Sequence, residues 1–115
     1  QLVCLTAMEP PSKFQPSAVR DEKLKVIEAL DPVSQTDIVR GQYRGRNGKG
    51  GYLEHVGNTK STTESYIAMK VTIGNWRWAG TPFYLRTGKK LRARTSEIAI
   101  IFRDPPHMIF PDVSE

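Results

Sequence analysis

Ser65-Tyr66-Ile67-Ala68-Met69-Lys70-Val71-Thr72-Ile73 alternates between two sets of side chains. Successive side chains of a strand point to opposite faces of a sheet. One face of residues 65–73 would therefore carry the apolar set Ile67, Met69, Val71 and Ile73. The pattern predicts a strand with one strongly apolar face.

Three further segments have strand character. Residues 38–43 and 83–86 are predicted to be short strands, and residues 96–103 alternate again, with Ile98, Ile100 and Phe102 on one face. Asp104-Pro105-Pro106 would end the last of these strands, because proline lacks the backbone donor that a strand ladder uses. The strands follow one another without intervening helices, which favours antiparallel pairing.

Two helices are expected before the strands. The apolar run from Leu2 to Met8 is typical of the end of a helix, and the prolines after Glu9 would stop it. Ser17 is the expected N-cap of a second helix that reaches about Leu30. The sequence therefore predicts an α+β fold, with a mostly antiparallel sheet and helices packed on one face.

Composition and chain length limit the classes of protein to which this chain can belong. The chain has 115 residues, a net charge of +5 and one cysteine, Cys4, which we expect to be buried. A single cysteine excludes an internal disulfide and favours a reducing compartment. No apolar run approaches the roughly 20 residues that span a bilayer. The chain begins at Gln1 inside an apolar run, so we expect it to be a piece of a longer protein.

A short segment after residue 85 concentrates positive charge. It contains Arg86, Lys89, Lys90, Arg92 and Arg94 within nine residues. Lysine and arginine donate charge-assisted hydrogen bonds to phosphate or carboxylate oxygens, so the segment is a candidate anion site. A solvated basic hairpin without a ligand is the alternative.

Other motifs give weaker signals. The loop Gly45–Gly51 is not a phosphate-binding P-loop, because Tyr43 stands where that motif needs its first glycine. The sequence lacks a dinucleotide fingerprint, and its one cysteine and two distant histidines, His55 and His107, cannot enclose zinc. Trp76 and Trp78 could stack on nucleic-acid bases, or could cover the end of a sheet.

Arg-Trp-Ala-Gly-Thr-Pro-Phe-Tyr-Leu-Arg-Thr-Gly-Lys-Lys-Leu, from Arg77 to Leu91, resembles the C-terminal domain of glucose-6-phosphate dehydrogenases. Further segments resemble the same family in the expected order, so the resemblance extends over nearly the whole chain. They are Leu5–Pro11, Arg20–Lys23, Arg40–Tyr43, Gly51–Leu53 and Thr63–Tyr66.

The resemblance implies a cytoplasmic, NADP-dependent oxidoreductase that oxidises glucose 6-phosphate to 6-phosphogluconolactone in the first step of the oxidative pentose phosphate pathway. In this family an N-terminal Rossmann domain binds NADP and carries the catalytic histidine and its aspartate partner. A larger α+β domain completes the substrate pocket and forms the dimer. Residues 1–115 resemble only this second, substrate-binding and dimerisation domain. The chain alone is therefore expected to hold no catalytic residue and to be inactive, and the whole protein to be a dimer or tetramer.

Carried over by position, Lys89 and Arg94 match the substrate-contacting residues of the family. Arg86 is a candidate cofactor residue, because its counterpart in animal members helps to hold a second, structural NADP. Two more basic positions of that site fall on Thr95 and Ala99, which are not basic, so a bacterial-type enzyme without the structural NADP is expected. The residues alone leave open a basic nucleic-acid-binding module and a purely structural dimerisation domain. The resemblance implies no nucleic acid, membrane or metal.

Overall fold

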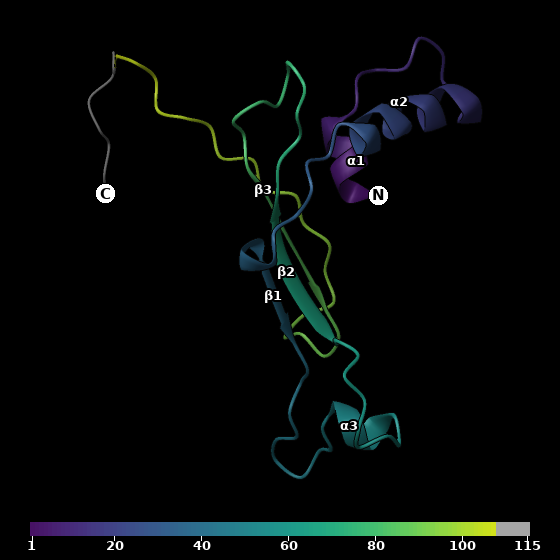
Figure 1. Ribbon diagram of the computed structural model, residues 1–115, viewed down its shortest axis with the longest axis vertical. Coiled ribbons are helices and arrows are strands. Elements are labelled where there is room, and N and C mark those ends of the chain that lie inside the picture. Colours follow the sequence, from purple (N-terminus) through teal and green to yellow (C-terminus); the bar gives the residue numbers. More distant parts are fainter. Residues whose placement is uncertain (108–115) are drawn as a thin grey trace.

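Three antiparallel strands form the sheet in the computed structural model, which describes residues 1–107. The strands are β1 (Ile38–Gly41), β2 (Tyr66–Val71) and β3 (Phe83–Gly88), and β2 lies in the centre (Figure 1). The register pairs Gly41 with Tyr66, and Tyr66 with Gly88, at one end of the sheet. The antiparallel sheet and the α+β class predicted from the sequence are confirmed.

The two helices near the N-terminus begin and end close to the expected positions. Helix α1 is Leu2–Ala7 and helix α2 is Pro16–Glu28. The expected N-cap of α2 is wrong, because Gln15 takes that position and Ser17 lies inside the helix. Pro16 can start the helix, since its fixed φ suits the first turn and its missing N–H has no partner there anyway.

The core lies where the helices meet one end of the sheet. Cys4 and Ala7 of α1, Val26 of α2 and Ile73 form a buried cluster, and Ile73 is only 1% exposed. Trp78 and Phe83 pack against this cluster, with their ring centroids 5.1 Å apart in an edge-to-face arrangement. The helices thus cover the sheet at the end where β2 is followed by the turn into β3 (Figure 1). Cys4 is buried, as predicted.

Two short helical turns and a tight turn lie outside the sheet and the two N-terminal helices. A 3₁₀ turn, η1 (Gln35–Asp37), precedes β1, and a one-turn helix, α3 (Tyr52–His55), follows the glycine-rich loop. Arg46 and Lys49 form a bridge across a tight turn in which Asn47 and Gly48 have φ of 53° and 74°. Asparagine and glycine tolerate positive φ at the two centre positions of such a turn. The glycine-rich loop Gly45–Gly51 thus forms a tight turn and contains no helix or strand.

The predicted strand at residues 96–103 is wrong. These residues have no strand assignment, and Ile98, Ile100, Ile101 and Phe102 are 54%, 66%, 94% and 86% exposed. A strand needs a neighbour to accept and donate its backbone hydrogen bonds, and alternation in the sequence does not supply one. This part of the chain instead runs away from the sheet (Figure 1).

The described chain is elongated. Its radius of gyration is 19.3 Å, whereas a compact domain of this length has about 13 Å. One end of the sheet carries the helices and the core, and the opposite end carries α3 (Figure 1). No helix in the described part is long and apolar enough to cross a membrane.

Candidate functional site

The basic segment begins where β3 ends. Gly88 is the last residue of β3, and the backbone N–H of Lys89 donates a hydrogen bond of 2.7 Å to the carbonyl of Ser65. The next residue, Lys90, has φ of 56°, a left-handed conformation that turns the chain. The backbone of Lys89 is therefore held at a defined place at the α3 end of the sheet, while its side chain is exposed.

Ser65 joins all three strands at this end. Its N–H donates to the carbonyl of Gly41 over 2.9 Å, and its hydroxyl oxygen accepts from the N–H of Tyr43 over 3.0 Å. Its own carbonyl accepts the hydrogen bond from Lys89. Ser65 is only 5% exposed. This role of Ser65 was not predicted from the sequence, because one serine before a strand carries no signal of its three partners.

The other predicted residues lie in different surroundings. Arg94 is exposed in the segment after β3, and the structure shows no hydrogen bond or ion pair for it among the described residues. Arg86 lies opposite Ala68 and is exposed on β3. Alternation places Arg86 on the face opposite to Leu85. The structure thus places Lys89 next to Ser65 but does not link Lys89 to Arg86 or Arg94 by a hydrogen bond.

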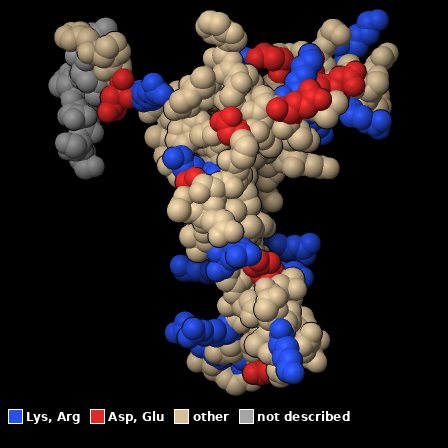
Figure 2. All heavy atoms as spheres, viewed as in Figure 1, with Lys and Arg blue, Asp and Glu red and all other residues tan. Residues whose placement is uncertain are grey.

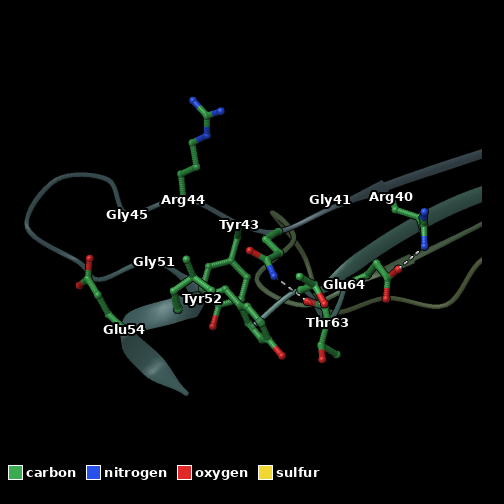
Figure 3. A pocket seen from close by; sticks show the side chains of 13 residues that line it. Arg40, Gly41, Tyr43, Arg44, Gly45, Gly51, Tyr52, Glu54, Thr63 and Glu64 are labelled. Carbon is green, nitrogen blue, oxygen red and sulfur yellow. Dashed lines mark hydrogen bonds and ion pairs between the residues drawn. The ribbon is translucent and has the colours of Figure 1, made fainter. Parts of the chain in front are cut away.

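An open hollow of about 1010 Å³ lies between the end of β1 and α3 (Figure 3). Thirteen residues line it, and they include Arg40, Tyr43, Arg44, Tyr52 and Glu64. Lys89 and Arg94 are not among them, although Ser65 follows the lining residue Glu64 directly. The hollow was not predicted from the sequence.

Hydrogen bonds and an ion pair hold the walls of this hollow. Arg40 forms an ion pair of 2.9 Å with Glu64. The backbone N–H of Glu64 itself, and then Arg40, lower the pKa of the Glu64 carboxyl. Tyr43 contacts Tyr52 edge-to-face at 5.6 Å, and its hydroxyl lies 3.1 Å from Nδ1 of His55. These contacts attach α3 to the end of β1.

Charge is unevenly spread over the molecule. On the face that Figure 2 shows, Lys and Arg side chains gather toward the α3 end of the sheet, whereas basic and acidic side chains are mixed over α2. Along the chain, α3 is flanked by the cations Arg44, Arg46, Lys49 and Lys60. The surface of this end would therefore attract anions.

The two tryptophans differ sharply in their surroundings. The indole N–H of Trp78 donates a hydrogen bond of 2.9 Å to the carbonyl of Ala7, the last residue of α1. Trp78 thus covers the end of the sheet, whereas Trp76 is fully exposed. Only Trp76 is free to stack on a base, which weakens the case for a nucleic-acid-binding module.

Among residues 1–107, no group of three or more histidine, cysteine, aspartate or glutamate side chains could hold a metal ion.

A family model described as the C-terminal domain of glucose-6-phosphate dehydrogenase matches residues 1–115. The chain belongs to the glucose-6-phosphate dehydrogenase family. It is 51% identical to the glucose-6-phosphate 1-dehydrogenase of Rhizobium meliloti, over 96% of this chain and 24% of that protein. It is 48% identical to the enzyme of the same name from Mycolicibacterium smegmatis, over 98% of this chain and 24% of that protein.

Solved structures of the family agree with this fold. The glucose-6-phosphate 1-dehydrogenase of Mycobacterium avium matches with a TM-score of 0.67 and 43% identity, over 76% of this chain and 19% of that one. A glucose-6-phosphate dehydrogenase in complex with its substrate glucose 6-phosphate matches with a TM-score of 0.66 and 38% identity, over the same shares. The chain spans about a quarter of the length of the curated relatives that it matches. The resemblance inferred from Arg77–Leu91 is therefore confirmed.

Proposed function

We propose that this chain is part of an NADP-dependent glucose-6-phosphate 1-dehydrogenase, which oxidises glucose 6-phosphate to 6-phosphogluconolactone. The observation that carries the proposal is the family match over residues 1–115. Identities of 48–51% to enzymes named glucose-6-phosphate 1-dehydrogenase support it. The same match favours an oxidoreductase over a nucleic-acid-binding module.

In this proposal Lys89 and Arg94 bind the sugar phosphate. An ammonium and a guanidinium group donate charge-assisted hydrogen bonds to phosphate oxygens. The hydrogen bond from Lys89 N–H to Ser65 restrains the Lys89 backbone before any substrate arrives. Such pre-organisation lowers the entropy lost when the substrate binds.

Proton abstraction from the anomeric hydroxyl requires a general base, and we place this base outside residues 1–115. NADP, when bound, accepts the hydride. The residues present here do not fit an NADP site, since the chain lacks a dinucleotide fingerprint and Thr95 and Ala99 are not basic. We therefore also place coenzyme binding outside residues 1–115, and we expect these residues alone to be inactive.

The proposal includes a homo-oligomer and a cytoplasmic location. Val39 and Tyr84 are 64% and 75% exposed on a sheet face that also carries Lys70 and Arg86, and we propose that subunits associate through the sheet. The single cysteine is buried and free, which is compatible with a reducing compartment.

The test is the rate of NADP reduction by the complete enzyme over a range of glucose 6-phosphate concentrations, with Lys89→Ala beside the wild type. A hydrogen bond to a charged group contributes about 1.5–3 kcal/mol. Lys89→Ala should therefore lower kcat/KM for glucose 6-phosphate by about 10- to 150-fold, with little change in the KM for NADP.

Lys60→Ala is the matched control. It removes the same charge from an exposed position near α3, and it should leave kcat/KM within about twofold. An unchanged kcat/KM for Lys89→Ala would exclude Lys89 from the substrate site. A wild-type enzyme that does not reduce NADP with glucose 6-phosphate would refute the proposed function.

A further inference from the structure

We propose that Ser65 is a positioning residue for Lys89, and that its hydroxyl group keeps Lys89 in place for substrate binding. The inference rests on the proposed function, because it needs Lys89 to contact glucose 6-phosphate. Ser65 acts through the backbone and does not touch the substrate itself.

Ser65 is buried at the α3 end of the sheet. Within residues 1–107, Ser65 is the single polar residue that is buried. A buried polar group needs hydrogen-bond partners, because its loss of water is otherwise uncompensated. The N–H, the carbonyl and the hydroxyl oxygen of Ser65 each have one: Gly41, Lys89 and Tyr43, respectively.

The position of Lys89 depends on its backbone. The Lys89 side chain is exposed, and no hydrogen bond or ion pair is formed by it among the described residues. Its backbone is restrained by the 2.7 Å hydrogen bond from its N–H to the carbonyl of Ser65. Lys89 follows Gly88, the last residue of β3, and precedes Lys90, which has a left-handed backbone conformation. Any displacement of the Ser65 carbonyl therefore moves the base of the Lys89 side chain.

The hydroxyl group holds the Ser65 backbone from the other side. The ladder between β1 and β2 ends at the pair Gly41–Tyr66, so the N–H of Tyr43 lies beyond it. The hydroxyl oxygen of Ser65 accepts this N–H, and the carbonyl of Tyr43 accepts the N–H of Tyr52 at the start of α3. The hydroxyl thus connects the segment that carries α3 to the residue that holds Lys89.

The experiment is a double-mutant cycle in the complete enzyme, with Ser65→Ala, Lys89→Ala and the double variant. If Lys89 binds substrate equally in the ground and transition states, its displacement raises KM and leaves kcat nearly unchanged. We expect Ser65→Ala to raise the KM for glucose 6-phosphate about fivefold, as loss of one ordinary hydrogen bond would, with kcat within about twofold. In the Lys89→Ala background the same change should alter KM less than about twofold, because coupled residues are non-additive.

Two further variants separate the hydroxyl group from general packing. Ser65→Thr keeps a hydroxyl and should restore the wild-type KM, whereas Ser65→Val has a similar shape without it and should behave like Ser65→Ala. If Ser65→Ala folds poorly, the comparison of Ser65→Thr with Ser65→Val still tests the hydroxyl group, because both β-branched side chains suit a strand. Ser61→Ala is the matched control, since the Ser61 hydroxyl also accepts a backbone N–H, that of Thr63, but at an exposed site. Its KM should stay within about twofold of the wild type.

An equal rise in KM in both backgrounds would overturn the inference, because Ser65 would then act independently of Lys89. Equal KM values for Ser65→Thr and Ser65→Val would overturn it as well. Failure of the proposed function gives a different result, since Lys89→Ala would then leave kcat/KM unchanged with Ser65 intact.

Discussion

Gly88→Ala tests how closely the end of β3 must approach β2. A Cβ atom on Gly88 would lie 2.8 Å from Cδ2 of Tyr66, 3.3 Å from Cδ2 of Leu91 and 3.4 Å from the carbonyl oxygen of Ser65. Carbon atoms in contact are normally at least 3.5 Å apart, so the chain or the Tyr66 ring has to move by about 0.7 Å. Lys89 is the next residue and should move with the chain.

The shift should affect both stability and activity. Overpacking of this kind costs about 1–3 kcal/mol of unfolding free energy. Where the chain moves, the Lys89 side chain is displaced from the substrate, so kcat/KM for glucose 6-phosphate should fall, mainly through a higher KM, by up to about 100-fold. Urea unfolding and initial rates of NADP reduction in the complete enzyme measure the two effects.

Gly41→Ala is the control for Gly88→Ala. Gly41 pairs with Tyr66 from β1, just as Gly88 pairs with it from β3, but a Cβ atom on Gly41 would meet nothing within 4 Å. Gly41→Ala should therefore leave kcat/KM within about twofold. Tyr66→Ala combined with Gly88→Ala should recover part of the loss, because it removes the crowded ring. Equal activity of the two glycine variants would refute the reasoning.

Trp78→Phe should lower the unfolding free energy by about 1–3 kcal/mol, because it leaves the buried carbonyl of Ala7 without its donor. Trp76→Phe at the fully exposed position should change it by less than about 0.5 kcal/mol, so equal urea midpoints would contradict the structure. The Glu64 carboxyl should titrate by NMR below 4.5, and in Arg40→Gln its pKa should rise only in part, because the backbone N–H remains. The ionised Glu64 carboxyl should add to the free energy of unfolding above pH 4.5, and this contribution should be lost as the pH falls through the lowered pKa. Glu64→Gln should remove this pH dependence.

Side-chain alternation predicted a strand correctly where that strand pairs with a neighbouring strand. Alternation in residues 65–73 gave β2 to within two residues at either end, because side-chain period is a local property of a strand. The same kind of alternation in residues 96–103 failed, because backbone pairing depends on a neighbour that the local sequence does not specify. Helix α3 was missed because a single turn has too few residues to show a helical period.

The sequence by itself determined the fold class and indicated a basic segment, Arg86–Arg94, as a candidate anion site, because side-chain alternation and charge are properties of neighbours along the chain. Its resemblance to a known family determined the family, and the same resemblance implied Lys89, Arg94 and Arg86 as site residues. Only the tertiary structure decided that Ser65 holds Lys89, that Trp78 and not Trp76 is packed, and that Gly88 is crowded where Gly41 is not. Each of these depends on atoms more than 20 residues apart along the chain that folding brings within a few ångströms, so no local pattern could reveal them.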